Sequence, residues 1–346
     1  MALGRPVPLS VLDLSPIGSG SGPAQALRNS IDLARHAERW GYHRHWVAEH
    51  HNMPGIASSA PAVLIAHLAA ATTRIRVGSG GVMLPNHPSL VVAEQFGMLE
   101  ALHPGRIDLG IGRAPGTDGA TAAALRRSAN PLSADEFPEQ LGDLLSFFDG
   151  EFPDDHPYRS IRAVPGLGNG PALWLLGSSG YSAQVAGILG LPFAFAHHFS
   201  PANTEPALEL YRTRFQPSAA LAEPYAMVAV AAVCAGSDAR ARRLHGSTRL
   251  SILRLRSGSP GTLPSPEEAA AYEYTADEAA MVDGFVADHV VGDPDTVRQG
   301  LDDLLRRTAA DELMVTTNVF DHAERLRSYE LIAQAAGLQA TTGPAA

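Results

Sequence analysis

The stretch "YHRHWVAEHHNMPG", residues 42–55, joins an apolar, strand-like run to a polar turn. Aromatic and aliphatic side chains around Trp46 predict a buried strand, and the residues from Asn52 to Gly55 are typical of a turn. Glu49, His50 and His51 therefore come directly after the carboxyl end of a strand. In folds with parallel strands, this edge carries the chemistry, so the stretch predicts both a fold class and a candidate site.

The same pattern recurs along the chain. Amphipathic segments such as "AQALRNSIDLARHAERWG", which ends on Gly41, separate the apolar runs and predict one helix in most gaps. Eight such units predict an α/β protein with a (β/α)8 TIM barrel, because an open doubly wound sheet usually closes with fewer strands. Besides the run at Tyr42, the predicted strands are "PLSVLDL" from Pro8, "RIRVGS" from Arg74, "RIDLGI" from Arg106, "ALWLLG" from Ala172, "PFAFA" from Pro192, "YAMVAVAAV" from Tyr225 and "ELMVTT" from Glu312.

Two segments are longer than a minimal barrel needs. The stretch from Asp149 to residue 170 is rich in Gly and Pro and predicts a long loop before strand five. Residues 244–290 are expected to form an insertion after strand seven, either a mobile lid or a plain surface excursion. We therefore expect one domain over residues 1–338 and a flexible tail over 339–346.

Composition limits the partners. The net charge is -10 and no run of basic residues is present, which argues against a nucleic-acid or anionic membrane surface. The single cysteine, Cys234, is expected to be a buried structural thiol, in keeping with a reducing cytoplasm. The N-terminus lacks the layout of a signal peptide, and the longest apolar run, residues 226–235, is about half a membrane span. A cytoplasmic protein with small-molecule partners is expected.

The histidines around the opening strand do not predict a metal centre. His43 and His45 imitate a His-x-His motif but fall at the opposite end of the strand from the expected catalytic rim. His50 and His51 are adjacent, so in an extended chain they point to opposite faces and cannot both bind one ion. A histidine that transfers a proton and a histidine that is merely hydrogen-bonded both remain open for this pair.

Two glycine-bearing turns predict an anion site. "LGIGRAPG", residues 109–116, departs from a dinucleotide fingerprint at Pro115 and leaves Arg113 just past a strand. "WLLGSSGYSAQVAG", residues 174–187, passes from strand through a small-residue turn into a helix, whose free N–H groups and serines suit a phosphate. An ordinary helix cap would explain the second turn alone, but together with Arg113 the phosphate interpretation is favoured. The serines concerned are Ser178, Ser179 and Ser182.

Four motifs together resemble the bacterial luciferase-like, flavin-dependent monooxygenases. They are "AEHHNMPG", "IRVGSGGVMLPNHPSLVVAEQF", "LEALHPGRIDLGIGRAPGTD" and "LGSSGYSAQVAGILGLPFAFAHHF". The resemblance implies a barrel that binds FMN as FMNH2, reacts it with O2 through a C4a-peroxyflavin, and oxygenates a hydrophobic small molecule. It also implies a separate flavin reductase that supplies FMNH2, and a homodimer formed through the helices expected near residues 58–73 and 90–102.

The resemblance also implies roles for individual residues. His50 matches the catalytic acid/base, with Glu49 and His51 as its neighbours, and Arg113 matches an arginine that binds the FMN phosphate. One departure is Gly112, which stands where luciferases carry a cysteine close to the flavin, so light emission is not implied. The other residues expected at the flavin are Gly80 and Gly81, joined by a non-prolyl cis peptide, the turn residues Gly177, Ser178, Tyr181 and Ser182, and Ala196 and His197 beside the ring.

The substrate and the reaction outcome stay open at this stage. Long-chain aldehydes and natural products such as aromatic polyketides are both compatible with the resemblance. A deazaflavin F420-dependent dehydrogenase on the same barrel is an alternative, although the Glu-His-His at strand two fits it less well. A non-catalytic flavin-binding protein is the alternative from a different class.

Overall fold

The computed structural model describes residues 7–126 and 135–340, and its core is a closed barrel of parallel strands. Strands β1 to β7 pair in chain order, and β9 closes the barrel between β7 and β1. The remaining strand, β8, stands outside the ring. All eight predicted strands are present, which confirms the (β/α)8 TIM barrel. The strands are β1 (Leu9–Asp13), β2 (Arg44–Val47), β3 (Arg76–Met83), β4 (Ile107–Gly112), β5 (Ala172–Gly177), β6 (Phe193–Phe195), β7 (Ala226–Cys234), β8 (Val290–Gly292) and β9 (Glu312–Thr316).

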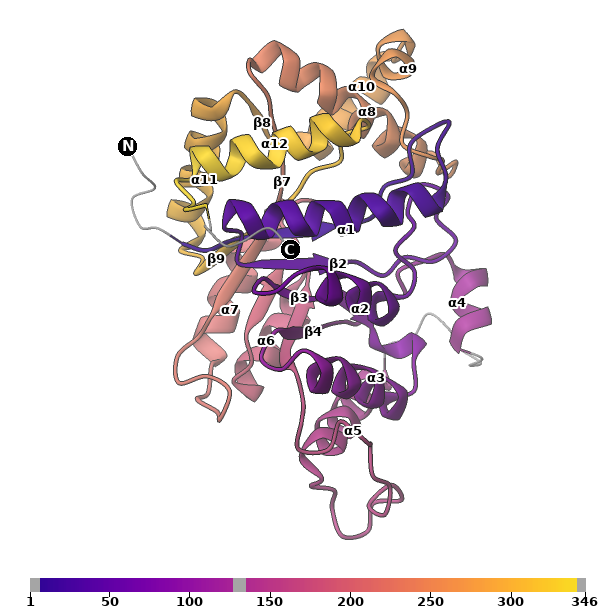
Figure 1. Ribbon diagram of the computed structural model, residues 1–346, viewed down its shortest axis with the longest axis vertical. Coiled ribbons are helices and arrows are strands. Elements are labelled where there is room, and N and C mark those ends of the chain that lie inside the picture. The colour runs from indigo at the N-terminus through magenta and orange to yellow at the C-terminus, as the bar shows by residue number, and fades with distance from the viewer. Residues whose placement is uncertain (1–6, 127–134, 341–346) are drawn as a thin grey trace.

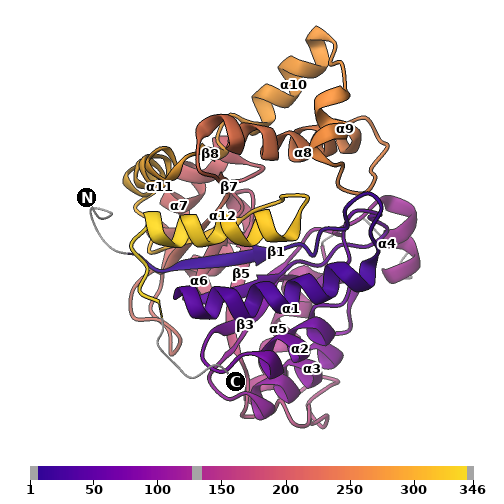
Figure 2. The same cartoon turned by 45° about the horizontal axis from the view of Figure 1, so that its top comes forward.

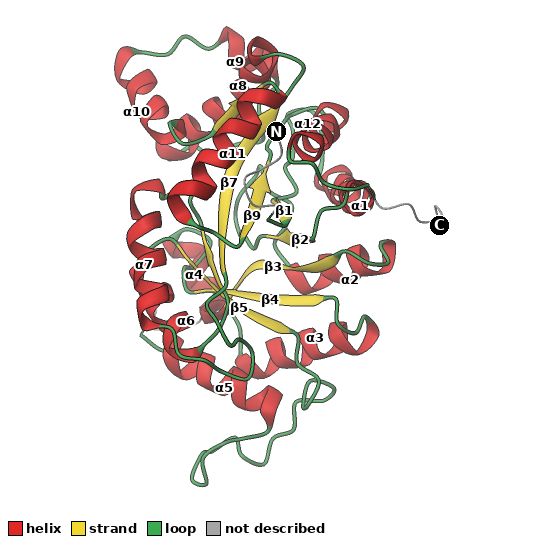
Figure 3. Cartoon of the chain, turned by 90° about the vertical axis from the view of Figure 1, so that its left-hand side faces the viewer, coloured by secondary structure: helices red, strands yellow, loops and turns green. Residues whose placement is uncertain are grey.

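Helices follow the strands and cover the outside of the barrel (Figures 1 and 3). The first of them begins at Pro23 and ends at Trp40, with Gly41 as its C-cap, as the sequence predicts. Gly41 is left-handed with φ 85°, and a Cβ there would lie 2.3 Å from the carbonyl oxygen of Gln339, so no other residue fits. The helices are α1 (Pro23–Trp40), α2 (Pro61–Ala71), α3 (Ser89–Leu102), α4 (Gly119–Arg126), α5 (Phe137–Asp149), α6 (Gly180–Leu189), α7 (Thr204–Arg214), α8 (Asp238–Arg256), α9 (Pro266–Ala271), α10 (Ala276–Val286), α11 (Pro294–Thr308) and α12 (His322–Ala335), with short 3-10 turns at Leu84–Asn86 and Pro201–Asn203.

The extra chain after β7 begins later than the sequence suggests. Leu244, the expected start of the insertion, lies inside α8, which begins at Asp238 and is the helix that follows β7. The additional elements are α9 and α10, which lie beside α8, and β8, which lies beside β7 and α11 (Figure 2). The β8 strand pairs with the end of β7, which extends past the closed ring. Residues 150–171 contain no helix or strand, as expected, and project beside α5 (Figure 1).

Side chains alternate between two cores, as parallel strands in a barrel require. The inward-facing apolar residues fill the barrel, while the outward-facing ones pack under the helices in a larger cluster. The rings of Trp46 and Trp174 meet edge to face inside, with centroids 5.2 Å apart. Other interior residues are Leu12, Ala48, Ala194, Met227, Ala229 and Met314.

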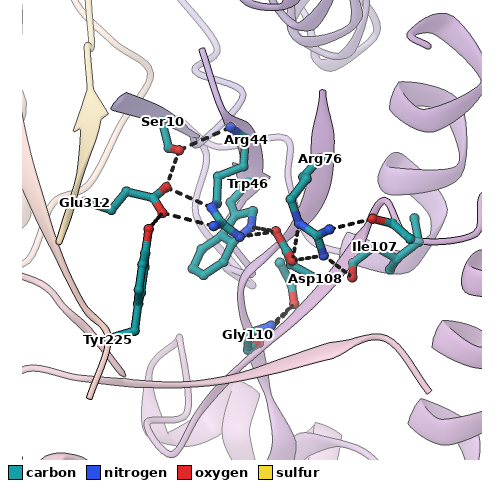
Figure 4. Close-up of polar contacts among 11 residues, drawn as sticks. Ser10, Arg44, Trp46, Arg76, Ile107, Asp108, Gly110, Tyr225 and Glu312 are labelled. Atoms are coloured by element: carbon teal, nitrogen blue, oxygen red, sulfur yellow. Dashed lines mark hydrogen bonds and ion pairs between the residues drawn. The ribbon is translucent and has the colours of Figure 1, made fainter. Parts of the chain in front are cut away.

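A buried ionic network closes the amino-terminal end of the barrel (Figure 4). Arg44 on β2 donates to both oxygens of Glu312 on β9, at 2.8 and 2.9 Å, and to Asp108 on β4 at 2.8 Å. Arg76 on β3 donates to Asp108 at 2.6 and 2.9 Å. Both carboxylates and Arg44 are buried, while Arg76 is partly exposed, so two cations balance two buried anions.

Neutral donors complete the same network. The Trp46 Nε1–H donates to Asp108 at 2.9 Å, the Tyr225 hydroxyl donates to Glu312 at 3.0 Å, and the Ser10 hydroxyl also donates to Glu312. The contacts reach six of the eight barrel strands or the residue before them. This end of the barrel is therefore a fixed base, and the opposite end is left for chemistry.

Three further expectations concern residues outside this base. His45 is fully buried, with its Nε2 3.6 Å from an Asp13 oxygen, and the described residues contain no group of three His, Cys, Asp or Glu that could hold a metal ion. Cys234 is a free, buried thiol, as predicted. In the described chain, no helix combines the length and apolar character needed to cross a bilayer.

The ionic base should dominate the stability of the barrel. Replacing Arg44 with Met leaves Glu312 and Asp108 buried with less compensation, and we expect the free energy of unfolding to fall by about 3 to 5 kcal/mol. Urea denaturation of the two proteins measures the change. Arg243→Ala, which breaks the exposed pair with Glu267, is the control and should change it by less than about 1 kcal/mol. A loss no larger than the control's would show that the network does not hold the barrel together.

Candidate functional site

A cavity of about 750 Å³ opens at the carboxyl-terminal end of the barrel. Its floor is made by the inward-facing Leu12, Trp46 and Met314, and its roof by side chains of α8 and α10. Most of the lining residues are apolar or glycine, so a ligand there is largely removed from water. The other residues that line it are Leu14, Ala48, His50, Gly80, Gly81, Met83, residues 112–116, Asp135, residues 176–179, Ser182, Ala194–Ala196, His198, Phe199, residues 231–233, His245, Thr248, Ile252, Leu255, Phe285, His289, Val291, Thr316 and Asn318.

Gly80 and Gly81 form a flat wall of the cavity. The peptide between them is cis, as predicted from the family resemblance. A Cβ on Gly81 would lie 2.8 Å from the Gly110 carbonyl oxygen, and one on Gly80 would lie 2.9 Å from a Leu12 methyl group. Only glycine fits at Gly81, where the Cβ would meet backbone, so backbone rather than a side chain faces the space between β3 and β4 at that position.

The turns after β4 and β5 bring positive groups to one end of the cavity. Gly112, Arg113, Gly177, Ser178 and Ser182 all line it. The helix α6 begins beside them, with Ser179 as its N-cap and unpaired N–H groups in its first turn. The sequence prediction that these two turns meet is confirmed, and the arrangement suits an anion.

Arg113 is positioned by the aromatic ring of Tyr181. Its guanidinium carbon lies 4.1 Å from the centroid of Tyr181, which itself does not line the cavity. No ion pair joins Arg113 to any carboxylate of the described chain. A guanidinium stacked on a ring and lacking a carboxylate partner is ready to bind an anion through charge-assisted hydrogen bonds.

Glu49 is a buried anchor and does not line the cavity. One of its oxygens lies 2.9 Å from Nε2 of both His51 and His87, and the other accepts the Met83 N–H at 3.0 Å. Burial raises the pKa of Glu49, but the hydrogen bonds from His51 and His87 outweigh it and bring the pKa to about 2. Glu49 is therefore an anion that fixes the loops after β2 and β3, and His51 is one of the residues that it holds.

His50 is the member of the Glu-His-His motif that faces the cavity. Its backbone N–H donates to the Ser58 carbonyl oxygen at 3.0 Å, while its ring Nδ1 is buried without a partner in the described chain. Burial lowers the pKa of His50, although the Glu49 charge opposes this. The ring is therefore neutral at neutral pH and able to take up a proton.

The two histidines after β6 point in opposite directions. Ala196 lines the cavity, but His197, which we expected beside it, does not. His197 instead faces a smaller hollow outside the barrel with Asp288 and Arg307, and its Nδ1 lies 2.8 Å from the Thr204 hydroxyl. The chain turns directly after β6, and His198 takes the position in the cavity.

Several site residues were not predicted from the sequence, although one of them, His87, lies within a family motif. His87 contacts Glu49 across 38 residues, and His245, Thr248 and Phe285 reach the cavity from the segment after β7. The family motifs do not extend to that segment. The only local sign was its position after strand seven, which suggested a lid.

Comparison with known proteins agrees with this geometry. The sequence profile of the family described as luciferase-like monooxygenase matches residues 7–312. A luciferase-like monooxygenase of Escherichia coli K12 is 50% identical over 327 residues, which are 94% of this chain and 96% of the relative.

Two solved structures share the fold. The crystal structure of apo-MsnO8 is 40% identical with a TM-score of 0.89, and the match covers 97% of this chain and 100% of that one. The oxygenating constituent of 3,6-diketocamphane monooxygenase from Pseudomonas putida, in complex with FMN, has a TM-score of 0.70 at 21% identity, and the match covers 95% of this chain and 97% of that one. Because the family profile matches most of its length, this chain belongs to the luciferase-like monooxygenases and is a flavin-dependent monooxygenase.

Proposed function

We propose that this protein binds FMNH2 and uses O2 to oxygenate an apolar small molecule. The observation that carries the proposal is a single cavity in which an anion-binding end, a flat glycine wall and an unpartnered histidine meet. These are the three features that a flavin phosphate, a flavin ring and a proton transfer would need. Under this proposal a separate flavin reductase supplies the reduced cofactor.

The residues present fit FMN. Arg113, the Ser178–Ser179 turn and the start of α6 would hold the phosphate, and Gly80 and Gly81 would lie against the ring. The diketocamphane monooxygenase constituent, which has the same fold, was solved with FMN, and this supports the same cofactor here. Bound reduced flavin would supply the electrons that activate O2.

His50 is the residue we assign to proton transfer. It lines the cavity, it is neutral at neutral pH, and no described side chain occupies its Nδ1. Its position follows from β2 and from the neighbouring Glu49, which ties the chain on either side of it to the loops after β3. His51 and Glu49 are positioning residues under this proposal, because neither lines the cavity.

The roof over the cavity would keep water from the reacting atoms. A segment before α9 is fixed to the loop after β1: the Leu263 carbonyl oxygen accepts from the Ser19 N–H, and the Leu263 N–H donates to the Ile17 carbonyl oxygen, both at 2.8 Å. Ser19 also donates to Glu268 at 2.7 Å. We propose that residues 257–289 act as a lid, and that long-chain aldehydes or aromatic natural products are the substrates to test first.

The experiment that tests the proposal compares flavin turnover with and without substrate. FMNH2 is mixed with the protein and 18O2, and decanal or an aromatic polyketide is added to parallel samples. One 18O atom in an organic product would support oxygenation. Oxidation of FMNH2 with no product from any substrate would point to a flavin-binding protein instead, and O2-independent reduction of F420 would point to a dehydrogenase.

The phosphate assignment can be tested by comparing two flavins. Arg113→Ala should weaken binding of FMN by roughly tenfold to a hundredfold, since a charge-assisted contact is worth about 1.5 to 3 kcal/mol. Binding of riboflavin, which lacks the phosphate, should change far less. Fluorescence titration measures both affinities. Equal losses for FMN and riboflavin would remove Arg113 from the phosphate site.

The role of His50 can be separated from cofactor binding. His50→Ala should leave FMN affinity within a few-fold but lower product formation by roughly 10² to 10⁴, the usual range for losing a general acid or base. His51→Ala is the matched control and should cost less, because His51 does not line the cavity. Partial rescue by added imidazole would support proton transfer. Product formation near the parent rate would make His50 a structural residue.

We also propose a homodimer through α2 and α3, which lie side by side (Figure 1). Val63 is 63% exposed, Met98 55% and Leu102 67%, which is unusual for apolar side chains on adjacent helices. Light scattering should therefore give twice the chain mass, and Met98→Glu with Leu102→Glu should give the monomer. Ile188→Glu, at an exposed position on α6, is the control. A parent protein that is monomeric at micromolar concentration would contradict the proposal.

A further inference from the structure

The cavity has a second end, away from the anion-binding turns, which is built by one face of α8. His245, Thr248, Ile252 and Leu255 all line it, and their spacing places them along one side of the helix. Phe285 of α10 faces the same space. The polar residues therefore lie at one end of this face and the apolar ones at the other.

The hydrogen bonds around His245 decide which of its ring nitrogens carries a proton. His289 Nε2 lies 3.2 Å from the His198 carbonyl oxygen, which can only accept, so His289 must donate from Nε2. A neutral His289 then has a bare Nδ1, and that atom lies 3.1 Å from His245 Nε2. His245 must therefore donate from Nε2, which leaves its own Nδ1 as a bare acceptor.

Both rings are neutral in this environment. Burial, together with the neighbouring His289, lowers the pKa of His245 to about 3, and burial likewise lowers the pKa of His289. No residue of the described chain donates to His245 Nδ1. Its lone pair is therefore available to a ligand.

Thr248, like His245, offers a ligand only a hydrogen-bond acceptor. Its hydroxyl donates to the Asn318 carbonyl oxygen at 2.8 Å, so the Thr248 oxygen can only accept a further hydrogen bond.

The charged residues that line the cavity are Arg113 and Asp135. The Arg113 guanidinium lies over the Tyr181 ring, and Asp135 lies two residues before Phe137, whose ring centroid is 6.4 Å from that of Tyr181. Among the described residues, no charged side chain of α8 lines the cavity, although the Arg256 guanidinium lies 5.9 Å from the centroid of the Phe285 ring.

We propose that the α8 end is the substrate subsite, and that it selects an uncharged, mostly apolar molecule whose hydroxyl or N–H group donates to His245 Nδ1. The proposal rests on the proposed function, because it assigns the anion-binding end of the cavity to the flavin. His245 is a specificity-determining residue in this scheme, and the pair of His289 and the His198 carbonyl sets its tautomer. Ile252, Leu255 and Phe285 would contact the apolar part of the molecule.

The experiment compares two probes that differ only in the donor. The probes are 2-naphthol and 2-methoxynaphthalene, and their binding is measured by calorimetry with and without saturating FMN. The parent protein should bind 2-naphthol about tenfold more tightly than the ether, because the ether leaves His245 without its hydrogen bond. With FMN saturating the anion-binding end, the anion 2-naphthoate should bind more weakly than 2-naphthol.

Two variants of His245 distinguish the acceptor from the ring. His245→Gln puts an amide nitrogen where Nε2 stood and keeps the bond to His289, but it has no acceptor at the place of Nδ1, so the preference for 2-naphthol should fall to about one. His245→Asn puts an amide oxygen near the place of Nδ1 and should retain most of the preference. Arg113→Ala should leave the preference unchanged, since that residue lies at the other end of the cavity.

Three outcomes would overturn the proposal. They are equal affinity of the parent protein for both probes, a preference that survives in His245→Gln, or a preference that disappears in Arg113→Ala. FMN titration of the same samples tests the proposed function separately. Failure to bind FMN would remove the flavin assignment, whereas the donor preference measured without FMN would still test the α8 end.

Discussion

The buried pairing of Arg44 with Glu312 and Asp108 is the constraint on which the rest of the molecule depends. The three residues come from β2, β9 and β4, so their contacts join strands that are far apart in the sequence. A buried ion pair is costly unless every partner is in place, and the barrel therefore has one favourable closed arrangement. Because the polar network occupies the amino-terminal end, the interior above it can be apolar and its far end can stay open.

The chemistry of the open end depends on the residues that the strand ends place there. β3 and β4 approach so closely that only glycine fits at Gly81, and this leaves a backbone wall where side chains would otherwise fill the barrel. β4 and β5 end in turns that bring Arg113 to the start of α6. β2 ends in His50, and the buried Glu49 beside it ties this loop to the loop after β3. Each strand therefore contributes one element of a site that no single strand contains.

The segment after β7 covers the open end of the barrel and encloses the cavity there. Helix α8 lies over the opening, and its contacts with the chain through His245, His289 and the His198 carbonyl fix both the helix and the tautomers of the two rings. The same hydrogen bonds that hold the roof also determine that its polar end accepts rather than donates. The roof and the proposed substrate preference thus have a common physical origin.

The sequence by itself determined the features that depend on neighbouring residues. Apolar runs and helical periodicity predicted the eight strands, Gly41 predicted the end of α1, and the two turns predicted that Arg113 and Ser178 lie at one site, where both line the cavity. The resemblance to a family added the cis peptide at Gly80 and Gly81.

Only the tertiary structure decided which histidines share the cavity. His198 rather than His197 enters it, because the direction of a side chain after a short strand depends on the exact register of the chain at that point. His245 contacts His289 across 44 residues, and His289 contacts His198 across 91. Periodicity reports which face of an element is buried, but it carries no information about which distant element lies against that face. Those contacts are set by how α8 packs over the closed barrel.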